Sequence, residues 1–82
     1  MSVYVGLDIG AYTVDVVTRQ GDKASKVEPF KQSVEGHKAL CSQLKRLKPE
    51  RIVMEATGVY YFDLAVTLAE AGLPVAVINP ES

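Results

Sequence analysis

Cysteine and histidine are almost absent from this chain. Its 82 residues include one cysteine, Cys41, and one histidine, His37. A single thiol excludes an internal disulfide framework and gives no cysteine spacing for a metal site, as is typical of proteins in a reducing cytosol. We interpret Cys41 as a small core residue and His37 as a residue at the boundary of a helix's apolar face, not as a ligand or a base.

Long apolar runs are missing as well. No run approaches the roughly 20 residues of a membrane span, and the first residues do not form a signal peptide. We therefore expect a soluble, cytoplasmic protein with no membrane partner. The hydrophobic share of 48% argues against disorder. Without repeats or linkers, residues 1–82 are predicted to form one small domain or a piece of one.

Basic residues are missing from both ends of the chain. All nine Lys and Arg lie between Arg19 and Arg51 together with four acids, whereas the flanks hold the other acids and no cation. Within this stretch, five basic residues gather in and just after the first predicted helix: Lys38, Lys45, Arg46, Lys48 and Arg51. They either contact nucleic-acid phosphates or form a solvated helix face, and the sequence favours neither.

Apolar alternation and turn residues predict the strands of a mixed sheet. We expect strands at residues 3–9, 12–19, 24–31, 52–56 and 75–78. Gly10 and Ala11 are predicted to form the first hairpin turn, with Gly10 at positive φ. Pro29 lacks a donor for the strand ladder, so the third strand is predicted to lie at an edge of the sheet.

Two amphipathic helices are predicted between the later strands. The first follows Ser33, a predicted N-cap, and ends before Pro49. The second is expected to start at Thr57 or Gly58 and to end at Gly72. An antiparallel meander joined to two right-handed parallel crossovers follows from this order, which gives a five-stranded mixed α/β sheet.

Two acids stand at the carboxyl ends of predicted strands, Asp8 and Glu55. If these strands are neighbours, the carboxylates meet where open α/β sheets place ligands. Close carboxylates repel each other unless a divalent cation compensates them, and oxygen ligands suit Mg²⁺ or Mn²⁺. A metal site is one interpretation. The other is structural, with Asp8 capping the turn at Gly10 and Glu55 capping the following helix.

Other residues with possible binding roles have structural interpretations. Asp15 lies in the middle of a strand, and we interpret it as solvent-facing or paired with a cross-strand cation rather than as a metal ligand. Tyr60 and Phe62 offer a stacking surface for nucleic acid, whereas Tyr61 fits the core better. Asp63 and Glu70 fall on the polar side of the second helix, where we expect them to be solvated.

Five segments carry a family resemblance: VGLDIG at 5–10, VDVV at 14–17, MEATGVY at 54–60, AGL at 71–73 and VINP at 77–80. Together they resemble the N-terminal DEDD domain of the insertion-sequence-110 family of transposases, relatives of the Piv-type DNA invertases. The resemblance covers nearly the whole chain. The segment from Met54 to Tyr60, with the distal Asn-Pro pair, is its most specific part. Ala11 departs from the family, which commonly has a lysine there.

The resemblance implies a ribonuclease H-like, RuvC-like fold in which four acids bind Mg²⁺, with Mn²⁺ as a substitute, and help to cut and join DNA at the ends of a mobile element. Asp8 matches the first acid and Glu55 the second. The family's third and fourth acids and its catalytic serine follow later, and this sequence contains neither, so we expect an N-terminal portion that is inactive alone. Implied partners are DNA, a structured guide RNA and further copies of the protein, in the cytoplasm of a prokaryotic cell.

Two alternatives come from other functional classes. The segment from Gly6 to Gly10, followed by a hairpin, also resembles the first phosphate-binding motif of actin-like ATPases and sugar kinases, which share the ribonuclease H-like sheet. Glu55 has no counterpart in that motif, and the hairpin tip lacks the usual Thr/Ser/Asn-rich loop. The last alternative is a non-catalytic α/β interaction module, which applies only if Asp8 and Glu55 lie far apart.

Overall fold

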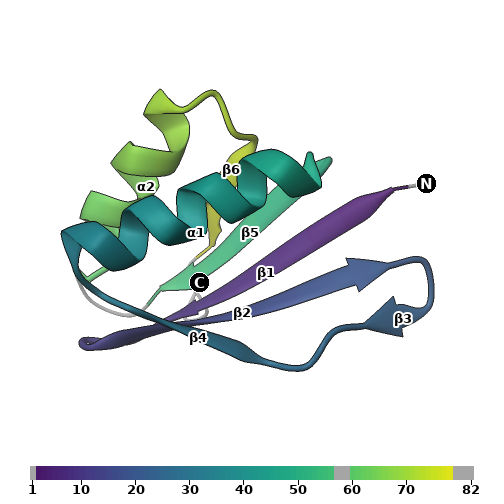
Figure 1. Ribbon diagram of the computed structural model, residues 1–82, viewed down its shortest axis with the longest axis horizontal. Coiled ribbons are helices and arrows are strands. Elements are labelled where there is room, and N and C mark those ends of the chain that lie inside the picture. Colours follow the sequence, from purple (N-terminus) through teal and green to yellow (C-terminus); the bar gives the residue numbers. More distant parts are fainter. Residues whose placement is uncertain (1, 57–59, 79–82) are drawn as a thin grey trace.

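The computed structural model in Figure 1 describes residues 2–56 and 60–78, and the strands of this part form one mixed sheet. The strands are β1 (Val3–Ile9), β2 (Thr13–Gln20), β3 (Lys23–Ala24), β4 (Glu28–Lys31), β5 (Arg51–Ala56) and β6 (Val75–Ile78), and the helices are α1 (Val34–Leu47) and α2 (Phe62–Glu70). The sheet order is β3-β2-β1-β5-β6, and β4 also pairs with β2. Strand β1 runs antiparallel to β2 and parallel to β5. The predicted meander with parallel crossovers is therefore confirmed.

In residues 2–56 and 60–78, the helices cover one face of the sheet. Along β1, Val3, Val5, Leu7 and Ile9 are buried, and the residues between them are exposed. Figure 1 shows α1 and α2 on the same side of the sheet. The buried apolar side chains of these elements make one core, which also includes Val14, Val16, Leu40, Leu44, Ile52, Met54, Leu64 and Leu68. No described helix or loop covers the opposite face. In the described residues, no helix is long and apolar enough to span a membrane.

Helix α1 begins and ends where its capping residues predict. The Ser33 hydroxyl accepts a hydrogen bond from the Gly36 amide at 3.0 Å, which satisfies one of the free donors of the first turn. At the other end, Lys48 adopts a left-handed conformation with φ of 51°, and its amide donates to the Leu44 carbonyl. Pro49 follows and is buried. The predicted N-cap at Ser33 is confirmed.

The third predicted strand, residues 24–31, is split into two short strands. Between the Arg19–Ala24 and Val16–Glu28 pairs, three residues face only two of β2, so one residue bulges out of the ladder. The Ser25 hydroxyl accepts from the Thr18 amide at 2.9 Å and donates to the Lys26 carbonyl, and in this way a side chain interrupts the ladder. The predicted five strands are therefore six. Pro29 lies on β4, at the edge that the sequence predicts.

The first hairpin differs from its prediction at Gly10. Positive φ occurs at Gly21 and Gly72 among the described glycines, so the prediction for Gly10 is wrong. The pairing of Ile9 with Val14 leaves a four-residue loop, residues 10–13, and within it the Gly10 amide donates to the Thr13 carbonyl at 2.9 Å. A loop of this length does not need the positive φ of a two-residue turn. Because the Gly10 amide donates to the Thr13 carbonyl, the interpretation of Asp8 as the cap of this turn is wrong.

Helix α2 begins at Phe62, and its N-cap, Tyr61, makes no side-chain capping bond. The predicted start at Thr57 or Gly58 lies outside the described residues. Glu55 lies on β5 and points to the face away from the helices, and the N-cap is Tyr61, so the interpretation of Glu55 as the cap of this helix is wrong. The predicted end is confirmed, since Gly72 has φ of 81° just past the helix and the Leu73 amide donates back to the Leu68 carbonyl.

Candidate metal centre

A depression of about 310 Å³ lies on the open face of the sheet, on the side away from the helices. Strands β1, β2, β5 and β6 and the bulge before β4 contribute its lining. The lining residues are Gly6, Leu7, Asp8, Asp15, Val17, Val27, Val53, Glu55 and Ile78. It therefore has an apolar floor and carries three carboxylates.

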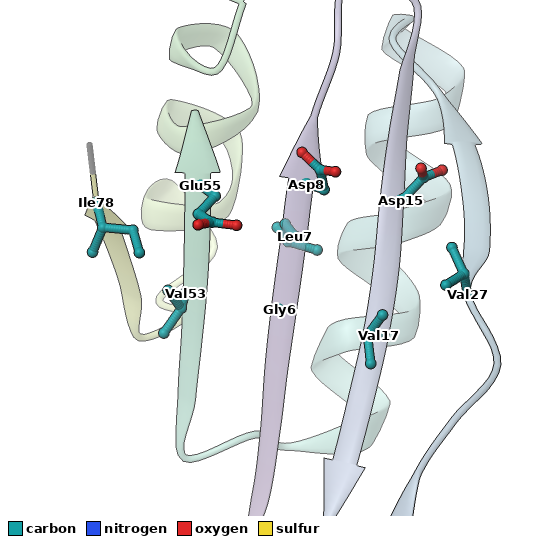
Figure 2. Close-up of a pocket in the computed structure, with 9 residues that line it drawn as sticks. All are labelled: Gly6, Leu7, Asp8, Asp15, Val17, Val27, Val53, Glu55 and Ile78. Atoms are coloured by element: carbon teal, nitrogen blue, oxygen red, sulfur yellow. The ribbon is translucent and has the colours of Figure 1, made fainter. Parts of the chain in front are cut away.

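Asp8 and Glu55 are brought together by the parallel pairing of β1 with β5. The register places Asp8 directly beside Glu55. Leu7 and Ile9 point into the core, so Asp8 between them must face outward, and Glu55 faces outward because Met54 points inward. Figure 2 shows both carboxyl groups on the same side of the sheet. The geometric condition set by the sequence, adjacent strands and a common face, is fulfilled.

Asp15 lies on the same face and at the same level. It is the cross-strand partner of Asp8, and on its other side it faces Pro29. Neither neighbour is a cation, so of the two predicted arrangements of Asp15 the pairing with a cross-strand cation is wrong, and the outward-facing arrangement is the one found. Its side chain is half-buried and lines the depression (Figure 2). The structure therefore adds a third acid to the two that the sequence singles out.

The alternation along β2 is the signal that predicts this position of Asp15. Val14 and Val16 are the inward residues of the hairpin's second strand, which turns Asp15 outward. The sequence interpretation considers Asp15 by itself and does not use the pairing of the hairpin strands, which places Asp15 opposite Asp8. Cross-strand partners in an antiparallel pair always share a face.

The charged side chains in the lining of the depression are all acidic. Its lining contains no Lys, Arg or His. Two carboxylates about 4 Å apart repel by about 1 kcal/mol even in water. Within residues 2–56 and 60–78, no three His, Cys, Asp or Glu side chains form a group that could hold a metal ion. The pair Asp8 and Glu55 therefore offers part of a ligand set.

The basic residues of the middle segment lie away from the acids. Lys38, Lys45 and Arg46 are exposed on α1, which covers the opposite face of the sheet. Arg51 starts β5, at the far end of the strand from Glu55. Phosphate contact by these residues stays a prediction. For the residues on α1 it would take place on another face than the depression, whereas Arg51 alternates with the buried Ile52 and shares the open face with Glu55.

The remaining residues singled out by the sequence lie in or near the helical layer. Cys41 and Tyr61 are half-buried and pack against the core, as expected. Tyr60 and Phe62 are exposed, and the Phe62 ring stands edge-on to the Tyr61 ring at 6.4 Å. None of these side chains lines the depression. Stacking of Tyr60 or Phe62 on a nucleic acid stays a prediction.

His37 is half-buried on α1, and burial lowers its pKa below the ordinary value of 6.5, although the charge of Asp63 acts in the opposite direction. As the pH falls, His37 is therefore protonated more readily in the unfolded chain than in the folded protein. We expect the free energy of unfolding to be constant above about pH 6.5 and to fall as the pH drops below it. Urea unfolding between about pH 7.5 and 5.5 measures this slope. His37→Gln should flatten it, and an unchanged slope would assign the effect to other groups.

Comparisons with known proteins agree with this geometry. The profile of the family DEDD_Tnp_IS110, described as Transposase, matches residues 5–82. Among solved structures, Thermus thermophilus RuvC in complex with a Holliday junction substrate is 23% identical with a TM-score of 0.64, covering 99% of this chain and 66% of that one. The fowlpox virus Holliday junction resolvase is 16% identical with a TM-score of 0.67, covering 98% and 62%. No curated protein matches the chain.

The same sheet also occurs in the alternative class. A ROK hexokinase from Thermus thermophilus is 21% identical with a TM-score of 0.65, covering 94% of this chain and 33% of that one. Such likenesses show the ribonuclease H-like fold and do not separate nucleases from kinases. The chain spans less than two thirds of the length of the RuvC and fowlpox proteins. The family profile does separate the two classes, because it covers nearly the whole chain: this protein belongs to the DEDD transposases of the insertion-sequence-110 family.

Proposed function

We propose that residues 1–82 are a single ribonuclease H-like catalytic-domain fragment, the N-terminal part of a DNA transposase or site-specific recombinase. The full-length protein would cut and join DNA at the ends of a mobile element, in the cytoplasm of a prokaryotic cell. One observation carries the proposal: Asp8 and Glu55 pair across adjacent strands on an open face, in a chain that matches the transposase family.

The chemistry of the two acids fits a divalent cation. Carboxylate oxygens are the ligands that Mg²⁺ and Mn²⁺ prefer, and the depression holds no cationic side chain that competes for them. Asp8 and Glu55 would hold Mg²⁺, or Mn²⁺ as a substitute, together with the further acids that the family implies. The bound ion would supply Lewis-acid stabilisation of charge on phosphate oxygens and a more acidic water molecule.

The protein's own contribution is to hold the two carboxylates in place. Each acid directly follows a core residue, Leu7 or Met54. The burial of that residue determines that the acid points to the open face of the sheet. Strand β1 is paired on both sides, and so is β5, so neither backbone is free to turn. Ligands on such rigid elements are positioned before the substrate arrives. The open face leaves space above them for a DNA backbone.

DNA is the partner that the comparisons support best, because the RuvC and fowlpox structures are described with Holliday junctions. DNA at the element ends and at the target would approach the depression. A structured guide RNA and further copies of the protein are proposed partners on the strength of the family resemblance alone.

Paramagnetic broadening of NMR signals tests the metal site. When Mn²⁺ is added to ¹⁵N-labelled protein, the amide signals of Asp8 and Glu55 and of their neighbours in β1 and β5 should broaden first. The exposed acids Asp63 and Glu70 on α2 are internal controls, and their amides should broaden no more than average. Broadening spread evenly over all acids would contradict the site.

The chain alone is predicted to lack strand-transfer activity. Asp8 and Glu55 are two acids, and the family reaction implies four acids and a serine. The assay incubates the chain with DNA of the element end and Mg²⁺ and measures cleaved and joined products on a denaturing gel. Product above the no-protein background, lost in Asp8→Asn, would show that these residues suffice.

A further inference from the structure

Gln32 connects three parts of the molecule at the carboxyl edge of the sheet. Its side-chain amide donates to the Gly10 carbonyl at 3.0 Å and to the Tyr60 carbonyl at 3.0 Å. Its carbonyl oxygen contacts Nε2 of His37, and its backbone amide donates to the Tyr12 carbonyl at 2.9 Å. Gln32 thus bonds residues 22 and 28 positions away in the sequence.

The hydrogen-bond pattern fixes the orientation of the Gln32 amide and the tautomer of His37. Both carbonyl partners require a donor, so the amide nitrogen faces Gly10 and Tyr60 with both of its hydrogens used. The amide oxygen can only accept, and His37 therefore carries its proton on Nε2. Every hydrogen-bonding group of the Gln32 side chain has a partner, which holds it in one orientation.

The two carbonyls that Gln32 binds belong to the segments that follow the candidate ligands. Gly10 lies two residues after Asp8, past the end of β1, and Tyr60 lies five residues after Glu55, ahead of α2. Beyond the ladder between β1 and β5, the Gln32 amide is a direct link between these segments. The Gln32 side chain is half-buried, and it does not line the depression.

We propose that Gln32 is a positioning residue for the metal centre: by linking the Gly10 and Tyr60 carbonyls, it adds to the β1–β5 ladder in restraining the relative placement of Asp8 and Glu55. The inference rests on the proposed function, because it concerns the same two carboxylates. Gln32 contacts neither carboxylate, so it acts through the backbone. Groups that orient metal ligands commonly contribute about 10-fold or more to metal affinity.

Gln32→Met tests the inference, because methionine keeps the length of the side chain and removes its hydrogen bonds. The dissociation constant for Mn²⁺ is measured by electron paramagnetic resonance of free Mn²⁺. We expect Gln32→Met to weaken Mn²⁺ binding by about 10-fold. Gln43→Met is the matched control, since Gln43 is also half-buried and donates to Glu28 of β4 at 2.9 Å, without touching β1, β5 or the segments that follow them. It should leave Mn²⁺ affinity unchanged.

Hydrogen exchange without metal separates failure of this inference from failure of the proposed function. The amides of Gly10 and Ala65 are hydrogen-bonded in the two linked segments. Both should exchange faster in Gln32→Met than in the wild type, and at the wild-type rate in Gln43→Met. If the wild type binds no Mn²⁺, the proposed function fails, and unchanged exchange then overturns the linking role as well. Wild-type Mn²⁺ affinity in folded Gln32→Met overturns the positioning role directly.

Gln32→Glu serves if the methionine variant does not fold. It keeps the length and the oxygen that faces His37, and it removes both donors to the carbonyls. The same loss of Mn²⁺ affinity is expected, and wild-type affinity would contradict the role of those two bonds.

Discussion

Replacing Asp8 with asparagine will raise the melting temperature of the metal-free protein and abolish the further rise that Mn²⁺ produces in the wild type. Asp8 lies between Asp15 and Glu55 in the sheet, and like charges directly opposite each other cost roughly 0.2–1 kcal/mol per pair. Asparagine keeps the shape and removes the charge. Mn²⁺ at 100 times its dissociation constant should stabilise the wild type by about 2.7 kcal/mol. Thermal melts followed by circular dichroism, with and without Mn²⁺, measure both effects.

Two control variants separate charge relief from loss of a ligand. Asp15→Asn removes the charge opposite Asp8 and leaves the proposed ligands, so it should raise the metal-free melting temperature and keep most of the Mn²⁺ effect. Asp22→Asn changes an exposed acid just after the far end of β2. It should leave the metal-free melting temperature and the Mn²⁺ effect unchanged. A lower melting temperature for metal-free Asp8→Asn would mean that Asp8 makes hydrogen bonds on which the fold depends.

Gly36→Ala is expected to destabilise the fold, although alanine is the better helix former. A Cβ atom on Gly36 would overlap the backbone carbonyl oxygen of Lys31 and stand 2.9 Å from its carbonyl carbon. Lys31 is held in the sheet by its pairing with Thr13 and cannot move aside alone. Overpacking of this kind costs about 1–3 kcal/mol, more than the gain of roughly 1 kcal/mol from helix propensity. Urea unfolding measures the difference.

Ala39→Gly provides the reference for propensity alone. Ala39 is exposed on the same helix, and glycine there should cost only about 0.5–1 kcal/mol, without any steric overlap. If Gly36→Ala is as stable as the wild type or more stable, α1 must be able to move away from β4. The close approach of the helix to Lys31 would then be dispensable.

The alternation of apolar residues predicts most of this fold. In β1 it separates the core residues from Asp8, and in β5 it separates Ile52 and Met54 from Glu55. Because side chains in a strand alternate strictly, a correct strand assignment also predicts the face of each acid. Helix boundaries with a physical marker, Ser33 and Gly72, are likewise predictable. The adjacency of β1 and β5 is only a condition at the level of the sequence, and the structure fulfils it through the parallel pairing of the two strands.

The features that sequence reasoning misses depend on single contacts between distant residues. The bulge before β4 forms because the Ser25 hydroxyl bonds the Thr18 amide, and nothing in the local pattern marks this serine. Gly10 has no positive φ because the loop between Ile9 and Val14 has four residues, a length that does not need the positive φ of a two-residue turn. Gln32 appears as an ordinary polar residue after a strand, and its role emerges only when its partners are placed in space.

The two edges of the sheet differ in their capacity to pair with a further strand. At the β3 and β4 edge, Pro29 offers no donor and the residue bulged out between the two strands breaks the ladder, so a further strand finds no continuous row of hydrogen-bonding groups. Strand β6 is different: Val75–Ile78 is uncharged, and its outer edge has no partner among the described residues. Strand addition, whether from more of the same polypeptide or from a second copy, will therefore take place on β6, next to the strand that carries Glu55.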